Sequence, residues 1–215
     1  MLAGTHDSGM YKLSGILPAG LSKGQRILYK LALLPGVRWF TNRLTLTQTM
    51  TIQQQLDAGI RLFDLRVTMG EDGELYLSHM FLSVQKYKDV VALLSTYLDA
   101  VVYTKPDYYH ESQQLNVPWQ DIQIWPDVPD VDAIRDAILA DKGLNKPCVV
   151  TWVSTNSIWS AIKTLLSGAT LCSMGVKAQD KLDDGVLKAL KKMDNVQGIL
   201  FDNPTVKTVN RIINQ

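Results

Sequence analysis

Two of the three histidines in this chain lie where predicted β-strands end, and histidine is the side chain best suited to proton transfer near neutral pH. His6 is followed directly by Asp7, and His79 closes the apolar run 75–78. An unperturbed imidazole has a pKa of about 6.5, so two imidazoles facing one substrate could act as general base and general acid in a single displacement. The alternative, which each histidine fits better when taken alone, is a hydrogen-bonded structural imidazole.

A predicted strand between the two histidines carries a carboxylate and a guanidinium on one face. Asp64 and Arg66 are two positions apart, so their side chains point the same way. Burying both is costly unless they are paired or functional. A planar guanidinium at such a place could clamp a phosphate through two parallel hydrogen bonds. A plain structural Asp–Arg ion pair explains the pattern equally well.

The elements that must position these side chains alternate between short β-rich runs and longer helical patterns, which is typical of α/β proteins. Helix signals include a threonine cap at Thr51 and a glycine stop at Gly59. Residues 112–131, rich in Gln, Pro and Trp, are expected to form a long excursion over one face. The predicted strands are 2–5, 60–67, 75–78, 101–104, 148–153, 170–174 and 198–201, and the predicted helices are 51–58, 84–98, 131–140, 181–193 and 206–213.

Polar side chains follow the strongest predicted strands, as expected when parallel strands close into a barrel and present side chains at their carboxyl ends. A doubly wound open sheet would usually place a glycine-rich phosphate loop after its first strand, and none is present. We therefore predict a distorted α/β barrel of parallel strands, with fewer than eight regular strands because the chain is short. The strand-end residues are His6 with Asp7, Asp64 with Arg66, His79, Lys105 and Asp202.

The composition is ordinary for a globular domain, with 46% apolar and 20% charged residues and a formal net charge of +1. No basic block is long enough for an electrostatic nucleic-acid binder, so we expect no nucleic-acid partner. No apolar run reaches about 18 residues, which argues against a transmembrane helix. We expect residues 1–215 to form a single domain that acts as a monomer.

Neither the start of the chain nor its cysteines settles the compartment. Residues 1–4 lead straight into a polar stretch without a charged or apolar leader. Either the protein stays where it is made, or an upstream signal is missing and the protein is secreted. Cys148 and Cys172 could form one disulfide, but we expect free buried thiols because Cys148 lies in an apolar run.

Several short motifs, in order, resemble the X domain of phosphatidylinositol-specific phospholipase C. The resemblance is to the calcium-independent bacterial-type enzymes and their eukaryotic X-domain-only relatives, and it is specific up to His79 and thin beyond it. It implies a distorted, incompletely closed TIM-type barrel, in agreement with the strand pattern. The motifs are GTHDSG at 4–9, TQ at 47–48, QLDAGIR at 55–61, DLR at 64–66 and LSH at 77–79.

By this resemblance, the two histidines carry the chemistry. His6 matches the general base that takes the proton of the inositol 2-hydroxyl, whose oxygen then attacks phosphorus to give a cyclic inositol phosphate. His79 matches the general acid that protonates the departing diacylglycerol oxygen. Arg66 matches the guanidinium that stabilises charge on the phosphate oxygens.

The resemblance also assigns three carboxylates. Asp7 matches the group that supports the acid, and Asp64 lines the same site. Asp202 ends a strand that looks like the last barrel strand of the family, whose aspartate orients the base histidine. A cap for the helix that follows is the alternative for Asp202.

Head-group contacts depart from the family pattern. Lys105 looks like a lysine that contacts the inositol ring, and Asp180 is similar to an inositol-binding aspartate, although its spacing to Asp202 is short. The arginine expected near 149–153 is absent, and Trp152 stands there. Met80 replaces the glycine that commonly follows the second histidine, which could crowd the pocket.

No metal or other cofactor is expected. Calcium takes roughly six to eight oxygen ligands, usually from several carboxylates. In calcium-dependent relatives an acid stands where this chain has Arg66, and a guanidinium there would repel calcium and could replace its charge on the phosphate.

The segment 23–40 is apolar with interspersed cations and ends in Trp39 and Phe40. Such a segment could lie in a bilayer interface, and the resemblance places interfacial contacts in the same region. We therefore expect a peripheral protein that meets an inositol phospholipid at a membrane surface. The alternative is an ordinary barrel helix that faces the core.

Two other functions stay open. A metal-dependent glycerophosphodiesterase on a similar barrel would need clustered acids after the first strand, whereas here no acid follows Asp7 until Asp57. A catalytically weak or silent phosphoinositide-binding module is favoured by the short chain and the missing arginine, but both histidines, Arg66 and Asp202 count against it. The sequence does not distinguish free phosphatidylinositol from a glycosylated anchor.

Overall fold

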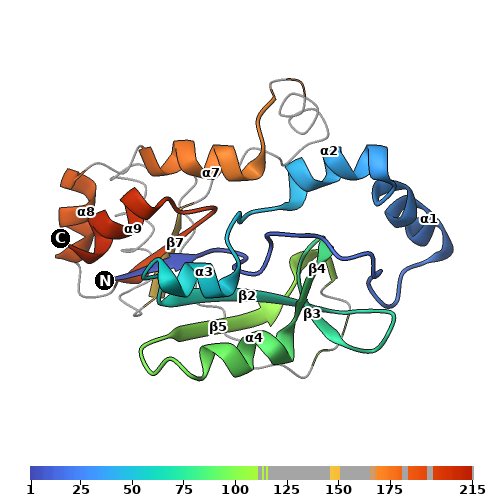
Figure 1. The fold of residues 1–215 in the computed structure, drawn as a ribbon, viewed down its shortest axis with the longest axis horizontal. Coiled ribbons are helices and arrows are strands. Elements are labelled where there is room, and N and C mark those ends of the chain that lie inside the picture. The colour runs from blue at the N-terminus through green and yellow to red at the C-terminus, as the bar shows by residue number, and fades with distance from the viewer. Residues whose placement is uncertain are drawn as a thin grey trace.

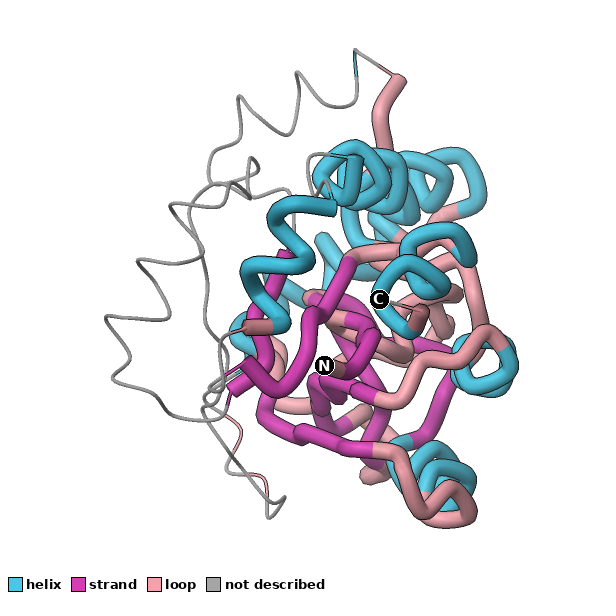
Figure 2. The backbone as a smooth tube through the Cα atoms, turned by 90° about the vertical axis from the view of Figure 1, so that its left-hand side faces the viewer, coloured by secondary structure: helices cyan, strands magenta, loops and turns pink. Residues whose placement is uncertain are grey.

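The described residues form one curled sheet of seven strands at the centre of the molecule, and five of these strands are parallel (Figures 1 and 2). The computed structural model describes residues 1–110, 113, 115, 146–150, 166, 168–180, 184–192 and 196–214. The first strand pairs with the last, as in a barrel, and within these ranges no strand joins the two outer edges, so the barrel is incompletely closed. The parallel order is β6 (Lys146–Val150), β7 (Val196–Phe201), β1 (Leu2–Thr5), β2 (Leu62–Met69) and β5 (Val101–Pro106).

An antiparallel hairpin distorts the parallel arrangement. It consists of β3 (Leu75–His79) and β4 (Phe81–Lys86), with Met80 as the one residue between them. β3 pairs with the carboxyl end of β2, beyond the point where β1 pairs with the start of β2. β4 was missed by the sequence analysis, which assigned residues 84–98 to one helix; only residues 87–94 are helical there.

Most predicted helices agree with the structure, and one predicted strand is wrong. Residues 170–174 belong to the cap and first turn of a helix, because Thr170 and Ser173 exchange side-chain and backbone hydrogen bonds in a capping arrangement. The predicted helix 131–140 and most of the excursion 112–131 lie outside the described residues. The helices are α1 (Lys23–Ala32), α2 (Pro35–Thr45), α3 (Ile52–Asp57), α4 (Tyr87–Leu94), α7 (Leu171–Asp180), α8 (Asp184–Lys191), α9 (Val206–Ile213) and the 3-10 turn η1 (Tyr108–His110).

Side chains of β2 point alternately to the two faces of the sheet. The outer face is apolar, and the inner face changes from apolar to charged along the strand. Phe63 and Leu65 pack outward into the main core with residues of α3, α4 and α9. Leu62 meets Leu200 on the inner face, and the next inward positions are Asp64 and Arg66. The interior is therefore apolar at the amino ends of the strands and charged at their carboxyl ends, where a site is expected.

A glycine permits the close approach of the central strands. A Cβ at Gly4 would lie 2.7 Å from both Leu200 and Leu62, so no larger residue fits inside the curl of β1.

Within the described ranges, none of the helices is sufficiently long and apolar to cross a membrane.

Candidate active site

The pairing of the first and last strands brings His6 and Asp202 together. Thr5 pairs with Phe201, and each chain then turns at the carboxyl end of its strand. The His6 amide donates to the Phe201 carbonyl at 3.0 Å, and His6 Nδ1 lies 2.9 Å from Asp202 Oδ1. Both side chains are buried. Asp202 thus contacts the imidazole, and Thr205 rather than Asp202 caps α9 through its hydroxyl.

Arg66 closes the other side of the His6 ring. Its Nε lies 2.9 Å from each carboxylate oxygen of Asp64, and its terminal Nη2 lies 3.2 Å from His6 Nε2. A guanidinium can only donate, so Nε2 accepts and the ring proton of neutral His6 resides on Nδ1, facing Asp202. This tautomer leaves Nε2 as the atom that can take a proton.

Asp7 lies between the two histidines. Its Oδ2 is 3.5 Å from His6 Nδ1 and 3.9 Å from His79 Nε2, and its Oδ1 is 3.7 Å from Arg66 Nε. The side chain is buried, yet neither oxygen has a hydrogen-bond partner among the described residues. Its backbone has φ 45°, a left-handed conformation that aspartate tolerates better than most residues. A buried carboxylate held this way is poised to balance positive charge on either imidazole.

His79 sits at the more open edge of the site. Its Nδ1 is 3.1 Å from the Thr45 carbonyl, which can only accept, so Nδ1 carries a proton and Nε2 faces Asp7. The ring meets Tyr109 edge-on at a centroid distance of 5.6 Å. The side chain is 22% exposed, against 8% for His6, so the acid expected from the sequence is the more accessible of the two histidines.

The shared charges shift the ionisation of the site. Burial by itself lowers the pKa of His6, but the negative charges of Asp7 and Asp202 outweigh it, and the net pKa is raised. Burial raises the pKa of Asp7 against the opposing pull of His6, His79 and Arg66. Burial also works against the charge of Arg66, but Asp64 and Asp7 raise its pKa, so the guanidinium stays charged.

The remaining predicted residues lie in different positions. Lys105 pairs with Arg66 across β5 and β2, and its side chain therefore lies on the same face of the sheet. Asp180 is the last residue of α7, and its side chain is outside the described part, as are Thr151 and Trp152. The structure places Lys105 next to the charged cluster and leaves Asp180 a prediction.

Three buried glutamines hold the loops that carry the site, and the sequence analysis gave them no role. Gln48 donates to the carbonyls of His6 and Phe201 at 2.7 and 3.1 Å. Gln55 accepts from the Thr5 hydroxyl and donates to the Ser8 carbonyl, both at 2.7 Å. The only sequence signal was that Gln48 and Gln55 fall inside the family-like motifs.

Gln179 holds the turn after β7 in place through side-chain hydrogen bonds to its backbone. It donates to the carbonyls of Asp202 and Asn203 and accepts from the amide of Thr205. α7 reaches this turn because Gly175 packs directly on Asp202, and a Cβ at Gly175 would lie 2.2 Å from the Asp202 carbonyl oxygen. The position of the carboxylate behind His6 thus depends on a helix that the sequence analysis had partly assigned to a strand.

Ligand atoms that could hold a metal ion also meet here. His6, Asp7 and Asp64 each offer one atom within 4.8 Å of the others. The guanidinium of Arg66 already contacts both oxygens of Asp64, and its fixed positive charge opposes a cation at the same place.

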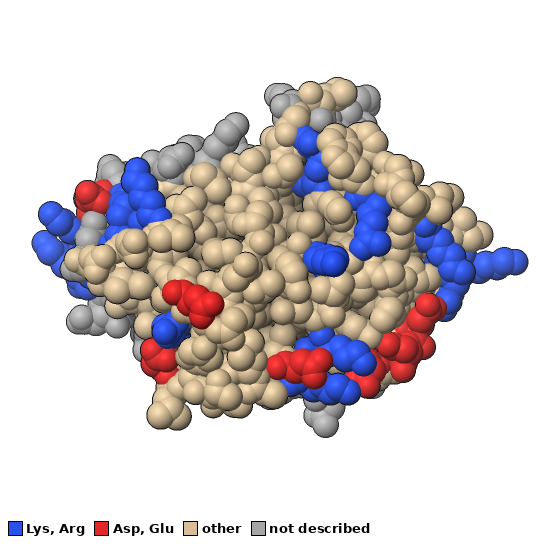
Figure 3. All heavy atoms as spheres, viewed as in Figure 1, with Lys and Arg blue, Asp and Glu red and all other residues tan. Residues whose placement is uncertain are grey.

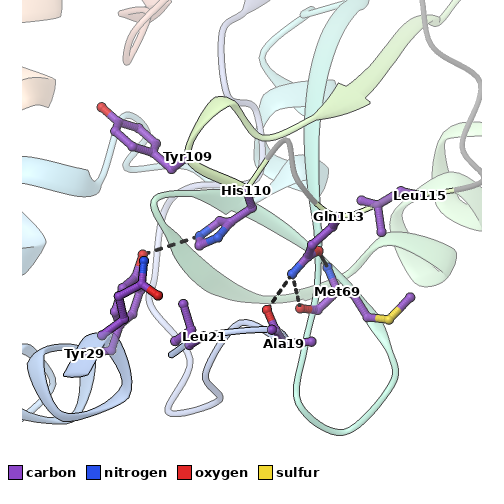
Figure 4. A pocket seen from close by; sticks show the side chains of 10 residues that line it. Ala19, Leu21, Tyr29, Met69, Tyr109, His110, Gln113 and Leu115 are labelled. Atoms are coloured by element: carbon purple, nitrogen blue, oxygen red, sulfur yellow. Dashed lines mark hydrogen bonds between the residues drawn. The ribbon is translucent and has the colours of Figure 1, made fainter. Parts of the chain in front are cut away.

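A cavity of about 490 Å³ lies beside this cluster. Tyr29, Met69, Tyr109, His110 and Gln113 are part of its wall (Figure 4), and Tyr109 also contacts His79. The cavity therefore borders the site on the His79 side.

Comparison with known proteins supports the family resemblance. No family model matches the chain. PI-PLC X domain-containing protein 2 is 27% identical over 115 residues in Mus musculus and 32% identical over 95 residues in Homo sapiens. These alignments cover 51% and 43% of this chain, but 34% and 31% of the relatives. The variant-surface-glycoprotein phospholipase C of Trypanosoma brucei brucei is 29% identical over 122 residues, which are 51% of this chain and 33% of that protein.

A solved structure resembles this chain in fold. The phosphatidylinositol-specific phospholipase C from Listeria monocytogenes matches 99% of this chain and 91% of its own, with a TM-score of 0.52 and 17% identity. The aligned segments span about a third of the length of the curated relatives. The chain therefore has the incompletely closed TIM-type barrel fold of a phosphatidylinositol-specific phospholipase C, and about half of it is similar in sequence to proteins with a PI-PLC X domain.

Proposed function

We propose that this chain is a phospholipase C-type phosphodiesterase that cleaves phosphatidylinositol, or a related inositol phospholipid, into a cyclic inositol phosphate and diacylglycerol. The observation that carries the proposal is the sharing of one buried carboxylate by two histidines. Asp7 Oδ2 lies within 3.5 Å of His6 and 3.9 Å of His79, with Arg66 against the same group. Two proton carriers and a fixed cation around one point fit an in-line displacement at phosphorus.

The first half of the reaction uses His6 as the base. Its Nε2 takes the proton from the inositol 2-hydroxyl. The electron pair left on that oxygen then forms a bond to phosphorus. The imidazolium that results keeps its Nδ1 proton toward Asp202 at 2.9 Å. Arg66 now donates to His6 Nε2 at 3.2 Å, so substrate binding requires its guanidinium to turn from the ring to a phosphate oxygen.

The second half uses His79 as the acid. The bond from phosphorus to the diacylglycerol oxygen breaks, and that oxygen takes a proton from Nε2 of His79. Asp7 Oδ2 lies 3.9 Å from this nitrogen, so a carboxyl oxygen stands beside the proton that is to be transferred. The greater exposure of His79 suits a group that must meet a lipid leaving the site.

We also propose that no metal takes part, because Arg66 supplies the positive charge at the phosphate. The guanidinium is buried and held in place by Asp64, so its position is fixed and little water screens its charge. Activity should then survive strong chelation.

The helix pair α1–α2 is the part of the molecule we propose to rest on the membrane. α1 has no fully buried residue, and Tyr29 is among the side chains that tie it to the hairpin. Trp39 and Phe40 are 55% and 46% exposed and meet edge-on. Such side chains are expected at an interface between water and lipid rather than in water. The other exposed apolar residues of this surface are Ile27, Leu28, Leu31, Leu34 and Val37.

The charge of the same surface suits an anionic lipid. Residues 23–45 hold Lys and Arg side chains and no Asp or Glu, and Figure 3 shows Lys and Arg side chains (blue) over the part of the molecule where α1 and α2 lie. Each cation near an anionic surface contributes about 1 kcal/mol to binding. The cations of the helix pair are Lys23, Arg26, Lys30, Arg38 and Arg43.

The proposal is tested by product analysis. Phosphatidylinositol vesicles are incubated with the protein and excess chelator, and phosphorus NMR is used to detect a cyclic phosphate. His6→Ala and His79→Ala should each lower turnover by about 10²–10⁴-fold while the variants keep their fold by circular dichroism. A glycosylated inositol phospholipid offered in parallel identifies the preferred head group.

Three outcomes would count against parts of the proposal. Activity that is abolished by chelator and restored by calcium would overturn the role given to Arg66. Normal turnover by His79→Ala on phosphatidylinositol would remove that residue from the mechanism. Vesicle binding with no product from the native protein would favour the silent lipid-binding module.

A further inference from the structure

The backbone of Met80, next to the proposed acid, is held by three buried or half-buried side chains. Met80 has φ 63°, in the left-handed region that favours glycine, and it forms the whole connection between β3 and β4. A methionine is strained in this conformation, so surrounding contacts must hold it there. Because Met80 follows His79 directly, contacts that fix the Met80 backbone also fix the backbone position from which the His79 side chain extends.

Three hydrogen bonds converge on this one residue. The Met80 amide donates to Asp107 Oδ2 at 2.8 Å. The Met80 carbonyl accepts from the Tyr29 hydroxyl at 3.0 Å and from His110 Nε2 at 2.8 Å. A carbonyl cannot donate, so His110 carries a proton on Nε2. Tyr29, Asp107 and His110 are called the Met80 clamp below.

The Met80 clamp is itself firmly placed. Asp107 and His110 are 2% and 6% exposed. The second oxygen of Asp107 accepts from the Tyr109 amide, and its own amide donates to the Val67 carbonyl of β2. Burial, then the nearby charge of Asp107, raise the pKa of Tyr29 to about 12, so this phenol keeps its proton. Figure 4 shows that Tyr29 and His110, which both line the cavity, face each other.

The position of the His79 ring is thus fixed at one ring nitrogen, at the ring itself and at the backbone. Its Nδ1 is tied to the Thr45 carbonyl, and its ring rests edge-on against Tyr109, the neighbour of His110. The clamp fixes the backbone end of the same residue. Nε2 is the ring nitrogen left to face Asp7 and the substrate.

We propose that Tyr29, Asp107 and His110 act as positioning residues for the acid, by holding the strained Met80 peptide that carries His79. The inference rests on the proposed function only for its kinetic consequence, since the hydrogen bonds exist independently of it. It gives the third histidine of the chain a role, and it explains how methionine is accommodated where glycine would be easier. It also connects α1, through Tyr29, to the acid.

The test compares two leaving groups. Diacylglycerol leaves as an alkoxide that needs a proton, whereas a nitrophenyl ester of inositol phosphate does not. Asp107→Ala, which removes the acceptor of the Met80 amide, should lower kcat on phosphatidylinositol by about tenfold or more and change the nitrophenyl ester by less than about threefold. Asp107→Asn keeps one oxygen acceptor, which can serve the Met80 amide but not the Tyr109 amide as well, and should recover part of the loss. The matched control is Asp89→Ala, an exposed acid in α4.

Several results would overturn the proposal. Equal losses on both substrates, or no recovery in Asp107→Asn, would mean that the clamp serves only stability. The loss caused by Asp107→Ala should be smaller in a Met80→Gly background, because glycine adopts this conformation without strain; strictly additive losses would contradict the mechanism. If Asp107→Ala does not fold, Tyr29→Phe carries the same comparison, with Tyr97→Phe as the control for losing a remote phenol.

Failure of the proposed function is recognised separately. A native protein that turns over neither substrate refutes the activity, and the clamp is then measured directly by nitrogen NMR of the His79 imidazole. Nδ1 of the native ring should give a single signal of a proton held toward the Thr45 carbonyl, and Tyr29→Phe should give more than one. An identical spectrum in the two proteins would overturn the clamp.

Discussion

Asp202→Asn should separate orientation of the base from proton transfer. The carboxylate lies 2.9 Å from His6 Nδ1, and both groups are buried, so the bond is charge-assisted once His6 is protonated. A hydrogen bond to a charged group contributes about 1.5–3 kcal/mol, which corresponds to roughly 10- to 150-fold in rate. The variant should therefore lose less turnover than His6→Ala, which removes the proton acceptor itself.

The same substitution should move the pH profile. Burial lowers the pKa of His6, and the charges of Asp7 and Asp202 raise it above its ordinary value. Removing one of these charges lowers the pKa, so the neutral base persists to lower pH. The acidic limb of kcat/KM should then shift toward acid, while Asp7 retains part of the elevation.

The assay is a pH series of initial rates on phosphatidylinositol in detergent micelles, with thermal unfolding measured on the same samples. Asp184→Asn, an exposed acid in α8, serves as the control for the loss of one carboxylate. An acidic limb that stays in place, or a loss as large as that of His6→Ala, would refute the orienting role.

Three further results are expected. Asp7→Asn should raise the free energy of unfolding at neutral pH, because it removes a carboxyl group that burial makes costly to ionise, while reducing turnover. The pKa of Asp7 is raised in the folded state, so its contribution favours folding at acid pH and is lost as the pH rises through that pKa; the gain in the variant should vanish in acid, and an equal gain at all pH values would contradict this origin. Replacing Trp39 and Phe40 by Ala removes apolar surface whose transfer to lipid is favourable by about 1 kcal/mol each, and should weaken vesicle binding by roughly 30-fold without affecting hydrolysis of a soluble, water-dispersed substrate. The exposed Leu98→Ala should change neither, and equal losses on vesicles and on the soluble substrate would mean that Trp39 and Phe40 stabilise the core. Cys172 is free and half-buried, its thiol donates to the Leu46 carbonyl, and burial raises its pKa to about 12, so in a Cys148→Ser background it should react with thiol reagents much more slowly in the native than in the unfolded protein; equal rates in the two states would contradict this protection.

The strands and helices with a clear local signal could be predicted from the sequence. β1, β2 and β7 follow apolar runs, and α9 follows a helical pattern, so each was found within a few residues. Local signals failed where two elements share one pattern. β4 runs into α4 without a turn residue between them, so a single helix absorbed both.

The ionisable residues of the site could be predicted from the sequence, but the contacts that hold them in place could not. His6, Arg66 and His79 stand out because ionisable residues at strand ends are unusual, and the family-like motifs join them. The supporting contacts depend on distant pairs such as Gln179 with Asp202, which no local pattern encodes. The positive φ of Met80 was also invisible, since sequence preference alone assigns methionine to ordinary backbone regions.

The contact between His6 and Asp202 joins residues 196 positions apart, almost the full described length of the chain. Contacts of such separation are among the slowest to form, because the intervening chain must be ordered before they are made. During synthesis the first strand and its histidine emerge long before β7, so the base has no oriented tautomer until the last strand docks against the first. The proposed activity is therefore expected to appear only when β7 docks, and a truncated chain that ends before β7 should be inactive.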